Sequence, residues 1–280
     1  MDKELIDQFI KNALAEDVGD GDHTSLSTIP ADTQGKAKLI IKEDGILAGV
    51  ELALEIFKVV DANLKVEVLL KDGDQVKVGD IGLTVSGSTH SILIAERLVL
   101  NCMQRMSGIA TKTNHIVALL KDTKTKILDT RKTTPGLRYL EKWAVRIGGG
   151  VNHRIGLYDM ILIKDNHVDY AGGISNAIKS AQKYLSDQQK SLQIEFEVRN
   201  IEELTQVLEI GGVDRIMLDN FSFDKLREAV KLIDGKFITE ASGGITEENV
   251  KEYADCGVDY ISMGALTHSV KSLDISLKAY

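Results

Sequence analysis

Residues 192–244 read LQIEFEVRNIEELTQVLEIGGVDRIMLDNFSFDKLREAVKLIDGKFITEASGG and contain the pattern that decides the fold. Three apolar runs in this stretch each end in polar or glycine residues, and amphipathic, helix-like segments separate them. Ile194, Ile216 and Ile238 hold equivalent places in the three runs and are 22 residues apart each time. A repeat of this length fits a compact β/α unit, in which helical crossovers join parallel strands.

The same alternation runs from residue 125 toward the end of the chain. Three further apolar runs end in polar or glycine residues, namely KTKILDTRKT (124–133), DMILIKDNH (159–167) and VDYISMGA (258–265). A doubly wound sheet would produce the same pattern. We expect an α/β barrel instead, because nearly every run ends in a polar residue and the strand ends of a barrel converge on one face, where active sites form.

The first part of the chain has a different pattern. Apolar residues at helical spacing predict helices over about 3–16, 50–60 and 91–120. Short β-like runs between 36 and 90, separated by Asp-Gly and Gly-Asp pairs, predict a largely antiparallel sheet. The aspartate- and glycine-rich segment 17–22 is predicted to be a turn, since its glycine position and the missing closing glutamate do not fit a calcium loop.

The composition excludes several classes of protein. The chain has 280 residues and a formal net charge of −8, whereas general nucleic-acid binding normally needs a basic excess. No apolar run approaches the roughly 20 residues that span a bilayer, and the acidic, amphipathic start does not resemble a secretory signal. Two cysteines cannot build a disulfide framework or a zinc site by themselves. We therefore expect a cytoplasmic protein that binds neither membranes nor nucleic acids.

One segment departs from the acidic average of the chain. Residues 129–167 contain seven Lys or Arg against four Asp or Glu, a local charge of +3. Lys142 and Arg146 lie four residues apart in a helical stretch and are predicted to be surface charges. The remaining cations of interest lie in less regular places, which makes them candidates for a site.

Four of these cations follow apolar runs or a glycine-rich loop. Arg131, Lys132 and Lys164 come at the ends of predicted strands, and Arg154, preceded by His153, follows the triple glycine 148–150. Arginine presents a rigid fork that suits carboxylate and phosphate groups. The pattern therefore predicts a pocket for a ligand with several negative charges.

The later strands contribute acids and glycines. Glu195 and Glu197 share one strand face, and Asp219 ends the next apolar run. Glu197 and Asp219 suit sugar hydroxyls or Mg²⁺, although they could instead pair with the cations opposite; Glu195, one step deeper, is expected to be structural. The turns Ser242-Gly243-Gly244 and Met263-Gly264-Ala265 let backbone N–H groups approach an anion, which predicts a phosphate site.

Together these residues resemble the quinolinate phosphoribosyltransferases, also called carboxylating nicotinate-nucleotide pyrophosphorylases. The similar segments run in order over almost the whole chain: EDVGDGDHT, AERLVLNCMQRMSGIAT, DTRKTTPGLR, GGGVNHRIGLYDMILIKDNH, IMLDNF, EASGGIT and ISMGALTH. The combination of TRKT, PGLR and the HR-GL-D-K-DNH pattern is far more specific than any single motif.

The resemblance implies a fold and an assembly. The expected fold is α/β, with an N-terminal α/β sandwich domain over residues 1–108, to which 270–280 return, and an incomplete TIM-like α/β barrel over 109–269. Members of the family form homodimers in which the N-terminal domain of one subunit covers the barrel mouth of the other. Active sites shared between two subunits are therefore expected.

The resemblance also implies roles for individual residues. The expected catalytic residues are Lys132, Glu197 and Asp219, with Lys132 beside the transferring centre and the two acids holding the ribose of phosphoribosyl pyrophosphate and Mg²⁺. The expected 5′-phosphate site is Ser242, Gly243, Gly244 and Gly264. Further substrate-binding residues, mainly for quinolinate, are Thr130, Arg131, His153, Arg154, Lys164 and, from the neighbouring subunit, Arg97.

The implied reaction joins quinolinate to phosphoribosyl pyrophosphate and yields nicotinate mononucleotide, pyrophosphate and CO₂. Three alternatives stay open on the residues alone. A paralogue of the same fold could use another anionic heterocycle or nicotinate, a Schiff-base aldolase could use Lys132 or Lys164, and a barrel could serve as a ligand sensor without catalysis.

Overall fold

The computed structural model describes residues 3–280, which form two compact units. The first unit contains residues up to 114 together with 134–149 and 270–280, and the second contains 115–133 and 150–269. The predicted boundaries placed residues 134–149 in the barrel. This segment instead packs within the first unit, where the buried Glu141 pairs with Arg105 at 2.8 Å and a Cβ at Gly148 would lie 2.5 Å from the carbonyl oxygen of Ala110.

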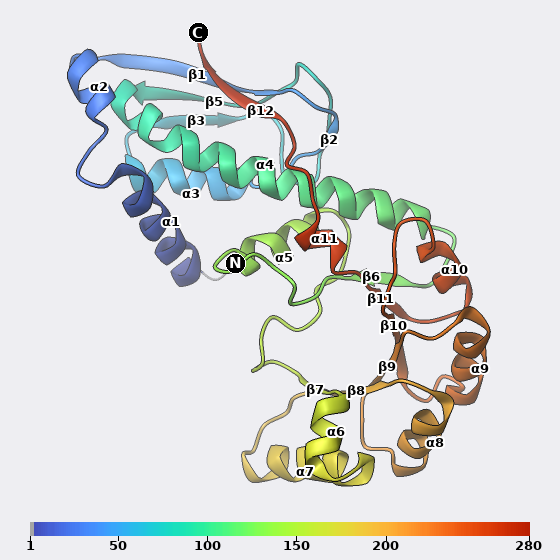
Figure 1. The fold of residues 1–280 in the computed structure, drawn as a ribbon. Coiled ribbons are helices and arrows are strands. Elements are labelled where there is room, and N and C mark those ends of the chain that lie inside the picture. The colour runs from blue at the N-terminus through green and yellow to red at the C-terminus, as the bar shows by residue number, and fades with distance from the viewer. Residues whose placement is uncertain (1–2) are drawn as a thin grey trace. The chain divides into compact units, whose positions relative to one another are not determined.

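The first unit is built on an antiparallel sheet with the strand order β12-β1-β5-β3 (Figure 1). Its strands are β1 (Gln34–Ile41), β3 (Lys65–Val68), β5 (Ile81–Ser88) and β12 (Ile275–Ala279), and a short pair is formed by β2 (Gly45–Ile46) and β4 (Gln75–Val76). Buried Ala37, Leu39 and Ile41 alternate with more exposed residues along β1, as expected for a sheet with one covered face. The predicted antiparallel sheet is confirmed.

Helices complete the first unit. They are α1 (Lys3–Val18), α2 (His23–Thr28), α3 (Val50–Val60), α4 (Thr89–Leu119), whose last turn belongs to the second unit, and α5 (Arg138–Ile147). Three were predicted from apolar spacing, and along α4 the apolar side from Ile92 to Met106 is buried as expected. Helix α2 was not predicted. It begins because Asp22, at the end of the Asp/Gly turn, accepts a hydrogen bond from the backbone N–H of Ser25.

The second unit contains six parallel strands in the order β6-β11-β10-β9-β8-β7. They are β6 (Lys126–Leu128), β7 (Ile161–Ile163), β8 (Ile194–Val198), β9 (Arg215–Asp219), β10 (Ile238–Ser242) and β11 (Tyr260–Ser262). All six correspond to predicted apolar runs. Strands β6 and β7 are the two edges of this sheet, so the barrel is incomplete, as predicted.

Helices follow the strands of the second unit (Figure 1). They are α6 (Asp165–Ala171), α7 (Ile174–Asp187), α8 (Ile201–Ile210), α9 (Phe223–Ile233), α10 (Val250–Asp255) and α11 (Ala265–His268). All five residues of β8 are buried because helices cover one face of the sheet and the interior of the barrel covers the other. This double coverage explains the nearly continuous apolar runs in the sequence.

The strand register decides which side chains share the barrel interior. Glu195 on β8 lies opposite Arg215 on β9, and Met217 lies between Glu197 and Glu240 of the flanking strands. In a parallel pair, opposed residues point to the same face of the sheet. The acids of β8 and β10 and the arginine of β9 therefore all face the interior.

One charge prediction was wrong. Lys142 is only 1% exposed, whereas Arg146 on the same helix is exposed as expected. Helix α5 buries the consecutive residues Leu140, Glu141 and Lys142, so more than one of its faces is covered. Spacing along a helix indicates which residues share a face, but it does not indicate how many faces are packed.

Among residues 3–280, no helix combines the length and apolar character that a membrane crossing requires.

Candidate active site

A cavity of about 860 Å³ opens at the C-terminal ends of the barrel strands. Its lining includes residues that follow β6, β7, β9, β10 and β11, together with residues of the strands themselves. Because parallel strands all end at the same side of the barrel, segments far apart in sequence meet here. Every predicted site residue of the second unit lies on the wall: Thr130, Arg131, Lys132, His153, Arg154, Lys164, Glu197, Asp219, Ser242, Gly243, Gly244 and Gly264.

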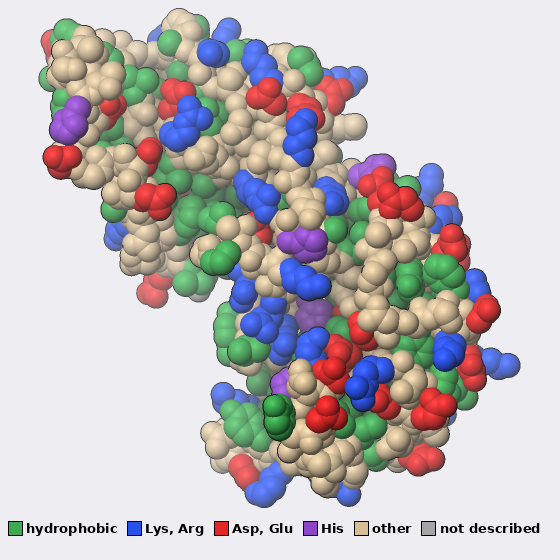
Figure 2. All heavy atoms as spheres, viewed as in Figure 1, with side chains coloured by type: hydrophobic (Ala, Val, Ile, Leu, Met, Phe, Trp, Pro, Cys, Tyr) green, Lys and Arg blue, Asp and Glu red, His purple; other side chains and the backbone are tan. Residues whose placement is uncertain are grey.

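Four cations converge on this cavity, as the local charge pattern predicted. Arg131, Lys132, Arg154 and Lys164 all contribute to its wall, and Figure 2 shows Lys, Arg and His side chains gathered beside acidic ones on the visible face. Burial lowers the pKa of Arg154, and repulsion from Arg131 lowers it further. Two guanidinium groups close enough to repel one another form a site that gains stability when an anion binds between them.

Asp129 fixes the loop that carries two of the predicted residues. This fully buried carboxylate accepts hydrogen bonds from the backbone N–H of His153 at 2.9 Å and from the side-chain amide of Asn152. Farther along the loop, Nη1 of Arg154 donates to the carbonyl of Met160 at 3.2 Å. The loop therefore holds Arg154 at the cavity wall by its backbone and by its side chain.

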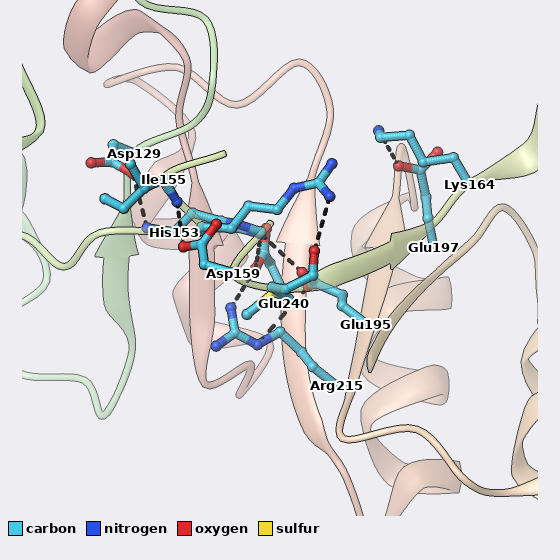
Figure 3. A network of polar contacts seen from close by, with 11 residues as sticks. Asp129, His153, Ile155, Asp159, Lys164, Glu195, Glu197, Arg215 and Glu240 are labelled. Atoms are coloured by element: carbon cyan, nitrogen blue, oxygen red, sulfur yellow. Dashed lines mark hydrogen bonds and ion pairs between the residues drawn. The ribbon is translucent and has the colours of Figure 1, made fainter. Parts of the chain in front are cut away.

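The two predicted acids have different partners. Glu197 is 9% exposed and accepts a hydrogen bond of 2.6 Å from the ammonium of Lys164, a pair that Figure 3 shows at one side of the site. The carboxylate of Asp219 accepts a hydrogen bond of 2.6 Å from the side-chain amide of Asn220. Glu197 therefore does form an ion pair with a cation opposite, which the sequence left open, and its other oxygen stays available to a ligand.

The glycine turn after β10 does not tolerate a side chain at position 243. Gly243 has φ +93°, and a Cβ there would lie 2.3 Å from Oδ1 of Asn220. Asn220 itself adopts a left-handed conformation with φ +56°, which asparagine tolerates better than most residues. Glycine at 243 is thus required twice, by the backbone conformation and by the close approach of Asn220.

The second glycine turn brings a histidine to the cavity. A Cβ at Gly264 would lie 3.0 Å from the ring of His268 and 3.0 Å from Cδ of Lys132. Thr267 donates a hydrogen bond of 2.8 Å to the carbonyl of Lys132, which ties α11 to the loop after β6. Lys132 and His268 therefore flank the same turn.

The sequence did not single out five polar residues of the wall, namely Asn220, Glu240, Thr246, Ser262 and His268. Asn220 could have been found, because it directly follows the strand-ending Asp219. Glu240 lies in a predicted strand, two residues before its end, and a single sequence does not show whether its side chain points into the barrel or toward the outer helices. His268 lies on a four-residue helix that no periodicity could predict.

A buried polar layer lies beneath the cavity and is drawn in Figure 3. Nε2 of His153 lies 2.9 Å from Glu195, and Nη1 of Arg215 donates to Glu240 at 3.0 Å. Burial raises the pKa of Glu195, and burial together with the charge of Glu195 raises the pKa of Glu240 to about 8. Glu195 is fully buried and is not part of the described cavity wall, whereas Glu197 is, which fits the structural place expected for Glu195.

Arg97 is a separate case. Its exposed side chain lies on α4 in the first unit, and it is not among the described residues that line this cavity. Its predicted place in the site of a neighbouring subunit stays a prediction.

The fold and the site define an α/β-barrel protein with a cavity for a ligand that carries several negative charges. The chain belongs to the quinolinate phosphoribosyl transferase family: the C-terminal domain of that family matches residues 109–278, and its N-terminal domain matches residues 22–107.

Relatives and solved structures agree with this assignment. The chloroplastic nicotinate-nucleotide pyrophosphorylase [carboxylating] of Arabidopsis thaliana is 52% identical over 96% of this chain and 81% of its own. A probable nicotinate-nucleotide pyrophosphorylase [carboxylating] of Bacillus subtilis is 46% identical over 98% of this chain and 92% of its own. The structure of the nicotinate-nucleotide pyrophosphorylase from Francisella tularensis superimposes with a TM-score of 0.93 at 40% identity, over 100% of this chain and 98% of that one.

Proposed function

We propose that this cavity transfers the phosphoribosyl group of phosphoribosyl pyrophosphate to quinolinate and releases nicotinate mononucleotide, pyrophosphate and CO₂. The observation that carries the proposal is the convergence of Arg131, Lys132, Arg154 and Lys164 on one wall, with acids and glycine turns around them, in a chain of this family. The reaction belongs to NAD biosynthesis, and the chain is a pentosyltransferase.

The acceptor binds among the arginines. Quinolinate carries two carboxylates, and Arg131 and Arg154 repel one another until such a dianion neutralises them. Each charge-assisted hydrogen bond contributes about 1.5–3 kcal/mol, so three or four can hold a dicarboxylate at micromolar strength after the costs of association. The ammonium of Lys164, held by Glu197, adds a further positive group beside the ring.

The donor binds across the barrel mouth. The backbone N–H groups of Ser242, Gly243, Gly244 and Gly264 suit the 5′-phosphate, because these turns present peptide groups without an intervening side chain. Glu197 and Asp219 suit the ribose hydroxyls. Lys132, next to the second turn, suits the leaving pyrophosphate.

The chemistry needs positioning and charge stabilisation and no protein nucleophile. The ring nitrogen of quinolinate forms a bond to C1 of the ribose while the C1–O bond breaks. The electron pair of the C1–O bond leaves with pyrophosphate. The product ring is a pyridinium, so its C2 carboxylate departs as CO₂, the electron pair stays at C2 beside N⁺, and C2 takes a proton from water. Lys132 stabilises the developing negative charge, and the arginines orient the ring for attack.

Mg²⁺ is part of the proposal. Glu197 and Asp219 fit it, because Mg²⁺ is held by one or two carboxylates together with substrate oxygens. When bound, Mg²⁺ neutralises charge on the pyrophosphate group. The support for this fit is that the two carboxylates lie at the ends of neighbouring strands, on the wall of one cavity.

The assembly and location are proposals as well. We propose a homodimer in which Arg97 completes the cavity of the partner subunit, supported by its exposed side chain on α4 and by the family resemblance. The cytoplasm is the proposed location, although the names of several plant relatives assign those proteins to chloroplasts or mitochondria.

The decisive experiment incubates the purified chain with quinolinate, phosphoribosyl pyrophosphate and Mg²⁺ and detects the products by mass. Nicotinate mononucleotide and CO₂ in equal amounts support the proposal. A parallel reaction with nicotinate as acceptor separates this function from that of a paralogue, and product formation only from nicotinate would reject it. A third reaction with excess chelator is expected to yield no nucleotide.

A further inference from the structure

His153 lies at the boundary between the cavity and the buried layer beneath it. The residue is 8% exposed, and both nitrogens of its imidazole ring have protein atoms within hydrogen-bonding distance. Nδ1 accepts a hydrogen bond of 2.7 Å from the backbone N–H of Arg154. Since Nδ1 accepts, the ring hydrogen lies on Nε2, which is 2.9 Å from Oε2 of Glu195 and 3.5 Å from Oε2 of Glu240.

Arg215 lies beside both of the carboxylates that face Nε2 of His153. Nη1 of Arg215 lies 3.0 Å from Oε2 of Glu240, Nε lies 4.0 Å from Oε1 of Glu195, and the guanidinium also lies over the ring of Tyr260 at 4.7 Å. Figure 3 shows Glu195, Arg215 and Glu240 reaching toward one another from separate strands. Arg215 is thus the counter-charge of a buried acid pair.

The layer leaves hydrogen-bonding capacity unused. Oε1 of Glu195, Oε1 of Glu240 and Nε of Arg215 are buried without a hydrogen-bond partner. His153, Glu195 and Glu240 could place three ligand atoms within 4.8 Å of one another, but Arg215 already supplies the positive charge that a metal ion would bring. Such groups cost free energy to bury, so a layer of this kind is expected to have a function.

We propose that His153 is a positioning residue, not a direct ligand of the substrate, and that Arg215 and Glu240 hold it in this role. The buried layer fixes the orientation of the His153 ring, and Nδ1 of that ring fixes the backbone N–H of Arg154. The guanidinium of Arg154 lines the cavity. The inference rests on the proposed function only for the identity of the anion that Arg154 binds.

This arrangement has a kinetic consequence. Arg154 binds the anionic acceptor both before and during the reaction, so a loosened Arg154 weakens binding more than it slows chemistry. Loss of Arg215 or Glu240 is therefore expected to raise the KM for quinolinate and to change kcat much less.

The first test determines the tautomer of His153 in the protein with its buried layer unaltered. Nitrogen-15 NMR of histidine-labelled protein, with the His153 signals assigned from a His153→Gln sample, reports which ring nitrogen carries hydrogen. We expect Nε2–H with an unprotonated Nδ1 near neutral pH, and only small changes of the Nε2 signal when quinolinate is added. A hydrogen on Nδ1, a doubly protonated ring, or a large Nε2 shift on adding quinolinate would overturn the proposal.

The second test uses variants of the layer. Glu240→Gln keeps an oxygen that can accept from Arg215, whereas Glu240→Leu does not, so only the leucine variant should raise the KM for quinolinate, by about tenfold or more. Arg215→Met is expected to behave like the leucine variant and to disturb the His153 signals. Arg199→Met is the matched control, since Arg199 pairs with Glu203 on the surface outside the cavity.

The outcomes distinguish a failure of the positioning role of His153 from a failure of the proposed transferase function. Folded Glu240→Leu or Arg215→Met with an unchanged KM and unchanged His153 signals would overturn the positioning role. If these variants do not fold, the tautomer in the unaltered protein still decides. Absence of any transferase activity would reject the proposed function while leaving the tautomer result valid.

Discussion

Arg131 has an exposed side chain at the rim of the cavity, so its charge can be removed without opening a hole in the core. We expect Arg131→Ala to raise the KM for quinolinate by roughly 10- to 100-fold, since a charge-assisted hydrogen bond is worth about 1.5–3 kcal/mol. Steady-state kinetics measure the effect, and an unchanged Tm shows that the fold persists. Arg227→Ala, on the outer helix α9, is the control and should have normal kinetics. Normal kinetics in Arg131→Ala as well would remove Arg131 from the site.

Glu240 makes stability depend on pH. Burial, followed by the charge of Glu195 on β8, raises its pKa from 4.5 to about 8. His153, Ser262 on β11 and Arg215 on β9 act in the opposite direction and only partly offset this rise. Because the folded-state pKa lies above the unfolded one, the folded chain binds more protons between these values, and the free energy of unfolding falls as pH rises through this range.

Replacing Glu240 with glutamine should remove this contribution. We expect the free energy of unfolding of the unaltered protein to decrease, relative to Glu240→Gln, between about pH 5 and about pH 8. Urea unfolding at several pH values measures the difference. Parallel pH profiles for the two proteins would show that Glu240 does not titrate in this range.

Among the elements, the turn after β10 combines two separate constraints. Gly243→Ala should lose about 1–2 kcal/mol from its left-handed backbone and should also displace Asn220, so the KM for phosphoribosyl pyrophosphate rises. Gly257→Ala is the matched control, because Gly257 has φ +89° but its nearest atom would lie 3.7 Å from the new Cβ. A similar loss of stability in both variants with a KM effect only in the first is expected. Equal KM values would disconnect this turn from donor binding.

Lys142 on helix α5 was predicted to be exposed but is buried, and the contribution of its burial to stability can be measured. Lys142 is buried and Arg146 is exposed, although they lie four residues apart on one helix. Lys142→Ala should lower the free energy of unfolding by about 2 kcal/mol or more through lost packing and unpaired neighbours, whereas Arg146→Ala should change it by less than about 0.5 kcal/mol. Denaturant unfolding of the two variants compares them. Equal stabilities would mean that the burial of Lys142 contributes nothing to the free energy of unfolding.

At the scale of the whole molecule, the proposed shared site can be tested by mixing inactive subunits. Arg97→Ala and Lys132→Ala each damage every site of their own homodimers. A mixed dimer has one site with both changes and one with neither, so random exchange should restore about a quarter of full activity. Activity after verified subunit exchange, measured with gel filtration of the mixture, provides the test.

The matched mixture uses two changes on the same cavity wall. Lys132→Ala mixed with Arg131→Ala should show no rescue, because every site then carries one damaged wall. Rescue in both mixtures, or in neither, would contradict a site completed by Arg97 of the partner subunit.

Much of the architecture follows from local patterns in the sequence. The 22-residue interval between Ile194, Ile216 and Ile238 determined a β/α repeat, and polar residues after each apolar run determined which end of the barrel carries the cavity. These signals are local, because side-chain alternation and strand length are set by the backbone within a few residues. The cations at 131, 132, 154 and 164 could be found for the same reason.

Only the tertiary structure decided how buried charges meet. Glu195, Arg215 and Glu240 come from three strands, and the parallel register brings them together beneath His153. A single sequence does not encode register across strands, nor the number of covered faces on a helix such as α5. Electrostatic interactions depend on distance through space and on burial, so the partners of a buried charge emerge only when the strands lie side by side.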